Sequence, residues 1–280
     1  MSNVAAWVGA RQIVEILEDK GEAEEDTRFG GAAMMVGNEG EDSVVLYLRM
    51  EERDEVSTTT IFDSSNYTNN MTIAGNAHID DSEMAPIELG DGDKVKKARY
   101  LVLGLDKEGK EAAGTLSSKI TLEKNTLRVA YFHPDPQRRG FTVEMWVKHT
   151  GRTGYMPLIT RGTEQDRMWS FGLENGYVVF MTTTGKMFTS SSVVPANTWK
   201  HIAATIDCTK KKDTVVTLFV DGKNVKEATI ASPEREPLDE NDQILIGGVN
   251  TIARITEVRY WASARTEDDI RDFHTKSYFL

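Results

Sequence analysis

One short stretch of the sequence concentrates side-chain oxygens that could bind a hard cation. Asp63, Asn66, Asn69 and Asn70 lie within eight residues of one another. Calcium takes about six to eight oxygen ligands, commonly a carboxylate together with amide and backbone carbonyl oxygens. The same residue types also form Asx turns, in which the side chain accepts hydrogen bonds from nearby backbone amides. Two interpretations therefore stay open, a structural calcium site or a self-satisfied turn, and we expect no other cofactor.

The other side chains that could do chemistry are scattered along the chain. The serines at 190–192 are not flanked by the glycines of a nucleophile elbow. The histidines show neither His-x-x-x-His spacing nor the spacing of a His/Cys zinc site; they are His78, His133, His149, His201 and His274. These patterns argue against zinc and serine-nucleophile chemistry, and we expect a protein that is not an enzyme.

Recognition of a glycan requires an exposed aromatic ring beside planar polar side chains. The candidates of that type are Tyr67, Tyr155, Arg167 and Trp169. Residues of these types more often pack at the rim of a β-structure than bind a ligand. No sugar-reading motif accompanies them, so residue type alone makes them ligand-binding candidates.

The first part of the chain has helical periodicity. Between residues 4 and 20, apolar side chains that include Trp7 and Val14 recur every three or four positions. An acidic stretch and a glycine-rich stretch follow. We therefore predict an N-terminal amphipathic helix and linker over residues 1–42, and one β domain over residues 43–280.

From residue 43 onward the hydrophobic periodicity changes to two, which is typical of β-strands. Many short strands without intervening helices predict an all-β protein, an antiparallel two-sheet β-sandwich of the jelly-roll kind. We expect the rings of Trp146, Trp199 and Trp261 to fill the space between the sheets, which stack about 10 Å apart. The predicted strands are 44–48, 100–103, 141–147, 176–181, 201–206, 214–220, 244–248 and 255–261.

A short C-terminal helix completes the predicted fold. Thr266 and Asp269 have the spacing of a capping box, in which each side chain bonds the backbone amide of the other residue. Ile270 and Phe273 follow at i, i+3 spacing, which would place both on the sheet.

Composition narrows the function classes. The net charge of −11 disfavours nucleic acid as a partner, since like charges repel. No apolar run approaches the ~18 residues of a membrane span. A single cysteine, Cys208, excludes an internal disulfide and fits a reducing compartment. Because the N-terminus also lacks the pattern of a secretory signal, we expect a cytoplasmic location.

Several segments occur in an order that matches a known family, for example Asn-Thr-Trp-Lys-His-Ile-Ala-Ala at 197–204 and Leu-Phe-Val-Asp-Gly-Lys at 218–223. Together they resemble the laminin G-like members of the concanavalin A-like lectin/glucanase superfamily. The remaining segments are 62–72, 141–147, 158–162, 171–176, 246–248, 255–261 and 265–270.

The resemblance implies the concanavalin A-like sandwich and leaves the function to the individual residues. Members often place a structural calcium near the turn that here begins at Asp63, but this chain departs from the usual pattern at Ser65 and Thr256. Retaining hydrolases of the superfamily carry Glu-x-Asp-x-x-Glu on one strand, and the chain has no such triplet: Glu144 lies without a second carboxylate on its segment.

The leading hypothesis is therefore a non-catalytic interaction module that binds a protein partner, as one component of a larger intracellular scaffold. The alternative is a lectin-like module that binds a carbohydrate, with or without calcium. A divergent glycoside hydrolase is the third hypothesis, and it requires two facing carboxylates on one sheet.

Overall fold

A computed structural model of the chain describes residues 44–50, 60–65, 69–83, 99–106, 108–111, 119–122, 140–162, 167–182, 187–210, 213–231 and 243–274. These residues are mostly in β-strands. The predicted helix over residues 4–20 and the predicted boundary between residues 42 and 43 lie outside them, and both stay predictions.

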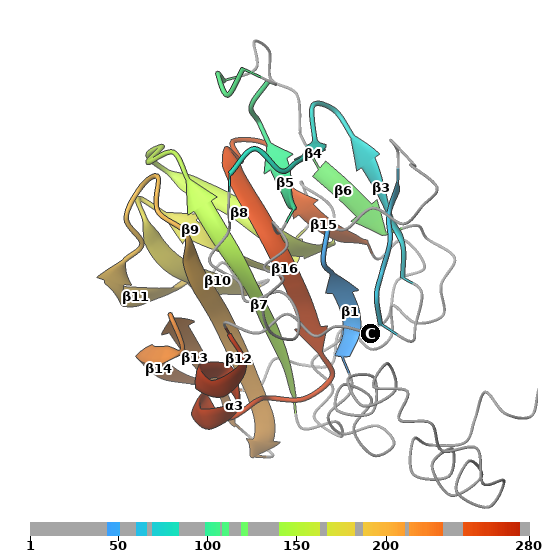
Figure 1. The fold of residues 1–280 in the computed structure, drawn as a ribbon. Coiled ribbons are helices and arrows are strands. Elements are labelled where there is room, and N and C mark those ends of the chain that lie inside the picture. Colours follow the sequence, from blue (N-terminus) through green and yellow to red (C-terminus); the bar gives the residue numbers. More distant parts are fainter. Residues whose placement is uncertain are drawn as a thin grey trace, which may run out of the picture.

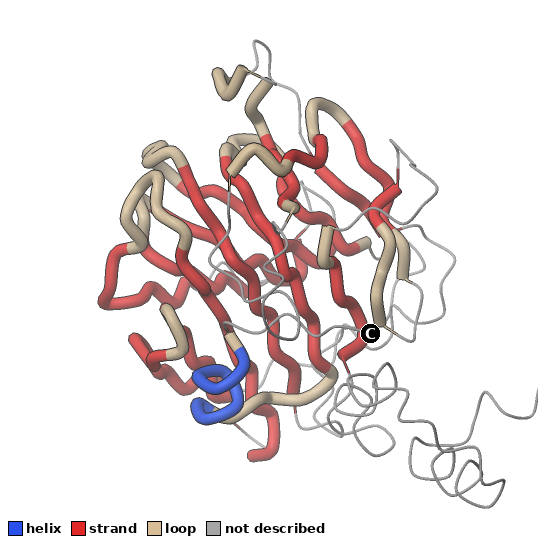
Figure 2. Tube along the Cα trace, viewed as in Figure 1, coloured by secondary structure: helices blue, strands red, loops and turns tan. Residues whose placement is uncertain are grey.

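The described strands form two antiparallel sheets stacked face to face (Figures 1 and 2). This arrangement confirms the predicted two-sheet β-sandwich. Sheet A runs in the order β14 (Lys223–Ala231), β13 (Asp213–Val220), β12 (Lys200–Lys210), β7 (Gly140–His149), β16 (Ala253–Trp261), β5 (Tyr100–Leu103) and β4 (His78–Asp80), with β1 (Val44–Leu48) also paired to β16. Sheet B runs in the order β11 (Met187–Val193), β10 (Tyr177–Thr182), β9 (Arg167–Glu174), β8 (Tyr155–Gly162), β15 (Ile244–Gly247), β6 (Lys119–Leu122), β3 (Met71–Ala74) and β2 (Thr60–Ile61).

The predicted strands all overlap observed ones, and two of them, 44–48 and 100–103, coincide with β1 and β5. Strands β2, β3, β4, β6, β8, β9, β11 and β14 were not predicted. In β9, Gly172 lies between the inward residues Phe171 and Leu173, and a Cβ added to it would lie 2.2 Å from the backbone oxygen of Met156 on β8. A glycine inside a strand often marks a place where another backbone approaches closely.

The main core lies between the two sheets and is built by side-chain alternation. On β7, Phe141, Val143, Met145 and Val147 point into this core, while the residues between them point to the opposite, outer face of sheet A. The ring of Phe141 stacks on Tyr260 of β16, with centroids 5.2 Å apart. Sheet B contributes a matching inward row from β9, namely Trp169, Phe171 and Leu173.

The prediction for the three tryptophans is wrong. Trp146 lies on the outer face of sheet A, where its ring stands 5.8 Å from that of His201. Trp261 packs in a separate outer cluster with Val44 and Tyr47. Trp199 is half-buried against a further cluster, which includes Tyr100 and Ile252. The tryptophan that does lie between the sheets is Trp169, whose ring is 5.2 Å from that of Phe141.

The predicted C-terminal helix is confirmed as α3 (Glu267–Phe273), which lies against sheet A (Figure 1). The hydroxyl of Thr266 accepts a hydrogen bond from the amide of Asp269 at 3.2 Å. In return, the Asp269 carboxylate accepts one from the Thr266 amide at 2.9 Å. This capping box satisfies amides at the helix start that have no partner within the helix.

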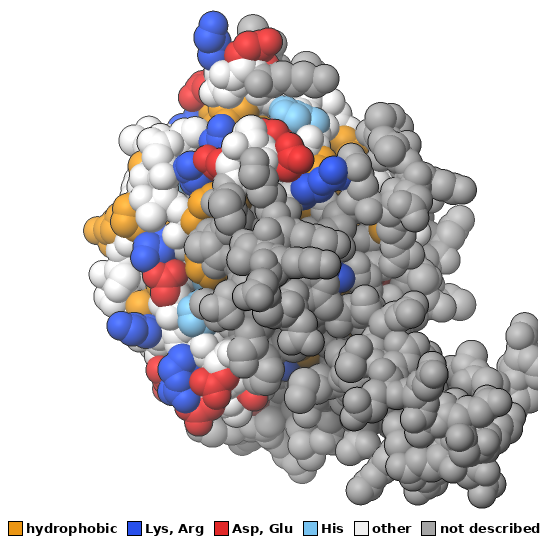
Figure 3. Space-filling view, in the orientation of Figure 1, with side chains coloured by type: hydrophobic (Ala, Val, Ile, Leu, Met, Phe, Trp, Pro, Cys, Tyr) orange, Lys and Arg blue, Asp and Glu red, His pale blue; other side chains and the backbone are white. Residues whose placement is uncertain are grey.

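The described helix is too short and too polar to cross a membrane. On the face of the molecule shown in Figure 3, acidic and basic side chains are mixed across the described surface. The large hydrophobic side chains that are exposed among the described residues are Val193 and Val249.

Candidate functional site

The outer face of sheet A carries a buried polar network centred on Glu144 of β7. This side chain is 2% exposed. Its Oε1 accepts a hydrogen bond from Trp261 Nε1 at 2.7 Å and lies 3.5 Å from Nη1 of Arg259. Its Oε2 lies 3.2 Å from Nε2 of His201. The partners come from β16 and β12, the strands on either side of β7, so pairing in sheet A assembles the network.

A second buried carboxylate, Glu257, joins the network through a β-bulge in β16. The pairing register between β16 and β7 shifts between Thr256 and Arg259, and Glu257 has a positive φ of 51°. A bulge of this kind changes the direction of a side chain. Here it lets Oε2 of Glu257 accept hydrogen bonds from the Tyr47 hydroxyl at 2.5 Å and from Nη2 of Arg259 at 2.7 Å.

Burial and neighbouring charges both shift the pKa values of these groups. Burial by itself would raise the pKa of Glu144, but the contact with His201 and the charge of Arg259 outweigh it, and this pKa lies well below its usual range. Burial lowers the pKa of His201, and this effect exceeds the opposing influence of Glu144. Burial, reinforced by the charge of Glu257, raises the pKa of Tyr47. At neutral pH the network therefore holds an ionised Glu144 beside a neutral His201.

This arrangement is poorly suited to glycoside hydrolysis. A retaining glycosidase needs one carboxyl group that stays protonated near neutral pH to protonate the leaving oxygen. Glu144 stays ionised, and Arg259 contacts both carboxylates. Because Glu144 and Glu257 are only 1% and 2% exposed, a sugar has no access to them. Two carboxylates on neighbouring strands, as a hydrolase would require, are thus present. Both are buried, however, and bind other side chains of the protein.

The residues predicted to bind calcium are partly brought together. The carboxylate of Asp63 is 2% exposed and accepts four hydrogen bonds, from the amide of Tyr47, the amide and hydroxyl of Ser65, and the amide of Asn69. The side-chain oxygen of Asn70 accepts a bond from the Asp63 amide at 3.0 Å. These contacts form the Asx turn that was the other interpretation of the segment.

Asn66 lies outside the described residues, as does Tyr67. Asn69 is fully buried, and its amide nitrogen donates to the Val45 carbonyl at 2.7 Å. Among the described residues there is no group of three or more His, Cys, Asp and Glu side chains that could hold a metal ion. The calcium site stays a prediction, and a cation there would have to compete with the four donors that Asp63 already satisfies.

Two of the predicted ligand-binding residues meet on sheet B. The guanidinium carbon of Arg167 lies 5.7 Å from the centre of the Tyr155 ring. The Tyr155 hydroxyl donates to the hydroxyl of Ser170 at 2.6 Å, and burial raises the pKa of Tyr155 to about 12. Trp169 points into the inter-sheet core and is 4% exposed, so its ring is not a surface platform.

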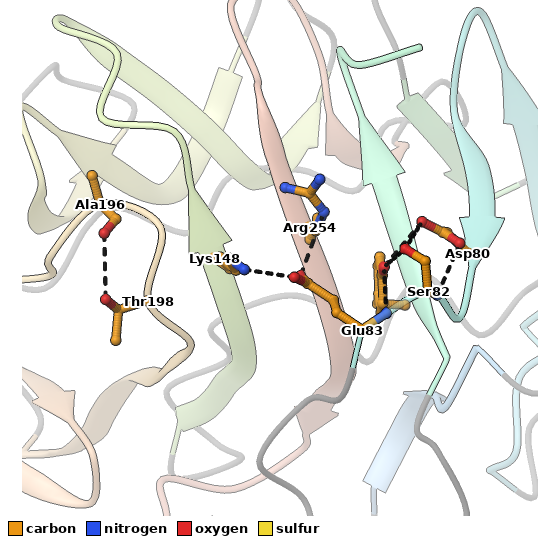
Figure 4. A network of polar contacts seen from close by, with 8 residues as sticks. Asp80, Ser82, Glu83, Lys148, Ala196, Thr198 and Arg254 are labelled. Atoms are coloured by element: carbon orange, nitrogen blue, oxygen red, sulfur yellow. Dashed lines mark hydrogen bonds and ion pairs between the residues drawn. The ribbon is translucent and has the colours of Figure 1, made fainter. Parts of the chain in front are cut away.

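A cluster of polar side chains that the sequence analysis missed lies on the outer face of sheet A (Figure 4). It is more exposed to solvent than the Glu144 network. The carboxylate of Glu83 is 2.6 Å from Nζ of Lys148 on β7 and 3.5 Å from Nε of Arg254 on β16. The side chains are partly exposed, at 30%, 19% and 20% respectively. The hydroxyl of Tyr100 fixes the segment before Glu83 by bonding both Ser82 and Asp80. We call these six residues the Glu83 cluster.

The Glu83 cluster could not be found from spacing, because Glu83 is separated from Lys148 by 65 positions in the sequence and from Arg254 by still more. The partial signal was a lysine and an arginine near the ends of two predicted apolar strands. Which strands would be neighbours, and therefore which charges would meet, is decided by sheet order.

The comparisons agree with the fold. The sequence pattern of the concanavalin A-like lectin/glucanases superfamily, in its laminin G form, matches residues 122–271, and the chain belongs to this family. No curated protein matches the chain.

Solved structures with this fold include receptor-binding domains of botulinum neurotoxins. The binding domain of botulinum neurotoxin serotype D is 16% identical, with a TM-score of 0.55 over 84% of this chain and 52% of that one. A botulinum neurotoxin type C structure is 14% identical, with a TM-score of 0.54 over 82% and 50%. The binding domain of botulinum neurotoxin DC, in complex with rat synaptotagmin II, is 15% identical, with a TM-score of 0.51 over 82% and 50%. This chain spans about half the length of these structures, and at such identities the likeness concerns the fold.

Proposed function

We propose that this chain is a non-catalytic binding module whose partner is a protein, within a larger intracellular assembly. The observation that carries the proposal is the Glu83 cluster. Three charged side chains from separate segments are held in one arrangement while remaining accessible to solvent. Side chains that are ordered before association lose less conformational entropy when a partner binds, which favours affinity.

Two further observations support a binding role rather than catalysis. Glu144, the best-placed buried carboxylate, is held ionised and lacks solvent access. Among the solved structures with this fold, one is a binding domain in complex with a protein, synaptotagmin II. Cys208 is the single cysteine of the chain and is buried, which fits a reducing compartment.

Carbohydrate binding is the second candidate, favoured by the Tyr155–Arg167 pair. An aromatic ring beside a planar guanidinium group is the combination that sugar recognition uses, and here the ring is oriented by the bond to Ser170. For botulinum neurotoxin type C, which shares the fold, cell entry is dependent upon interaction with two ganglioside molecules.

The test is affinity capture from the source cells with quantitative comparison of variants. We expect a specific protein to be recovered with the unmodified chain and lost with Glu83→Gln and Lys148→Ala. Arg152→Ala is the matched control, because Arg152 forms a more exposed pair with Glu111 at 3.7 Å outside the cluster. Loss of the partner with the control as well, or retention with both cluster variants, would contradict the proposed surface.

A glycan array with and without calcium separates the two candidates. Binding that a free sugar competes away, and that Arg167→Ala abolishes, would favour the carbohydrate. Cleavage of β-glucans at enzyme-like rates by the unmodified chain, lost in Glu144→Gln, would overturn both binding roles.

A further inference from the structure

The C-terminal helix is held on sheet A by a small apolar contact and a close backbone approach. Ile270 is fully buried against Ala203 of β12 and Phe219 of β13. The turn between β13 and β14 comes so near that a Cβ on Gly222 would lie 2.8 Å from the Cα of Arg271. A helix of seven residues has little stability of its own, so its position depends on these contacts.

His274, the C-cap residue that follows α3, lies close to a second histidine, His201. The carbonyl oxygen of His274 accepts a hydrogen bond from Trp146 Nε1 at 2.7 Å, and its ring stacks on the Trp146 ring with centroids 6.2 Å apart. The ring of His201, on β12, is 5.5 Å from the His274 ring. His274 is half-buried and His201 is 1% exposed. Two imidazoles therefore lie together beneath the end of the helix.

The surroundings of His201 favour its neutral form. Glu144 of β7 is the acidic side chain that faces it, at 3.2 Å from Nε2, and Glu144 also contacts Arg259 of β16. Arg259 places positive charge on the same side, while Asp221 accepts a hydrogen bond from the His201 backbone amide and pairs with Lys200. The buried Nδ1 of His201 has no hydrogen-bond partner among the described residues. A proton on both ring nitrogens would leave Nδ1–H without an acceptor, which is costly in a buried site.

We propose that His201, with the His274 ring packed against it, is an acid-sensitive latch that keeps α3 on sheet A at neutral pH and releases it when His201 is protonated. The His274 ring, 5.5 Å from that of His201, helps to bury it while α3 is docked. Release uncovers the apolar side chains of Ala203 and Phe219 on the outer face of sheet A. The proposal does not depend on the identity of the binding partner.

The sign of the pH dependence follows from burial. Burial lowers the pKa of His201 below its ordinary value of about 6.5. The docked helix is therefore fully favoured above that value, and docking weakens as the pH falls from about 6.5 toward the lowered pKa. One proton that binds preferentially to the released state shifts the docking equilibrium by up to about tenfold per pH unit.

The test is hydrogen exchange of the full chain between pH 8 and pH 5, corrected for the intrinsic pH dependence of amide exchange. In the unmodified protein we expect the amides of α3 to lose protection by up to about tenfold per pH unit below 6.5, while β7 and β9 stay protected. In His201→Gln and His274→Gln this change should be reduced or abolished. His78→Gln is the control, since His78 lies on β4, where its Nδ1 contacts the Asn76 carbonyl oxygen at 3.0 Å.

His274→Gln decides the question if the buried His201→Gln variant fails to fold, because the Trp146 bond goes to the backbone of residue 274 and survives the substitution. Equal protection of α3 at pH 8 and pH 5 in the unmodified protein would overturn the latch. So would simultaneous loss of protection in β7 and β9, or an unchanged pH response in the histidine variant that folds.

Discussion

The indole nitrogen of Trp261 donates a hydrogen bond to the carboxylate of Glu144, a residue 117 positions earlier in the chain. Both side chains lie on the outer face of sheet A, not between the sheets. The same carboxylate contacts Arg259 and His201. An aromatic residue and a lone acid, which looked unrelated in the sequence, are thus members of one buried network that joins β7, β12 and β16.

Replacing Glu144 with Gln tests the energetic weight of this network. Removing one member of a buried ion pair leaves the other charge uncompensated, which costs about 3 to 5 kcal/mol. We expect a loss of that order in the free energy of unfolding at pH 7, measured by urea denaturation. Asp268→Asn is the control: Asp268 pairs with Arg271 on the surface, with 77% of its side chain exposed. If Glu144→Gln lowered the free energy of unfolding no more than Asp268→Asn, Glu144 would not be a member of a buried ion pair.

The network also predicts how stability responds to acid. Because the pKa of Glu144 lies below its usual value in the folded protein, the stabilisation is present above about pH 4.3 and is lost as the pH falls further. The free energy of unfolding should therefore decrease more steeply between pH 5 and pH 3 in the unmodified protein than in Glu144→Gln. Parallel curves for the two proteins would argue against an ionised, paired Glu144.

Two tryptophan substitutions separate the hydrogen bond from the loss of ring area. In Trp261→Phe, Glu144 loses a donor at 2.7 Å, and leaving a buried acceptor short of a partner costs about 1 to 3 kcal/mol. In Trp199→Phe, the lost Nε1 has no hydrogen-bond partner among the described residues. Thermal unfolding should show the larger decrease in Tm for Trp261→Phe; the reverse order would remove the hydrogen bond as the explanation.

Gly222 is predicted to be required for the docking of α3. Its φ of 74° disfavours any residue with a Cβ by about 1 to 2 kcal/mol, and the added carbon would meet the backbone of Arg271 at 2.8 Å. Gly154→Ala is the matched control, since its φ is 89° but an added Cβ has nothing within 4 Å. We expect Gly222→Ala to lower the Tm further and to speed amide exchange in α3, whereas equal effects would mean that only the backbone angle matters.

Calcium is expected to leave the stability unchanged. Both oxygens of Asp63 already accept two hydrogen bonds each, so a cation that used Asp63 as a ligand would have to compete with them. The Tm should agree in millimolar calcium and in chelator, while Asp63→Asn should lower it in both. A rise in Tm with calcium that disappears in Asp63→Asn would instead establish the metal site.

Local sequence patterns were sufficient to predict those elements whose structure is determined by neighbouring residues. Strand β1 was predicted with its observed bounds from a run of apolar residues, and β5 likewise. The capping box of Thr266 and Asp269 was also predictable, because the two residues form it within one helical turn. The family resemblance, carried by the order of such segments, agreed with the observed sandwich.

Which face of a strand lies in the core depended on the tertiary structure. Nearly every residue of β7 is buried, so alternation of polar and apolar residues does not mark the inner face. Trp146 and Val147 are both hydrophobic and both buried, yet they point in opposite directions. The Glu144 network, the Glu83 cluster and the pair of His201 and His274 likewise require segments that are distant in sequence to be neighbours. Hydrophobic periodicity is a property of neighbouring residues, whereas sheet order and the covering of the outer face result from packing of the complete chain.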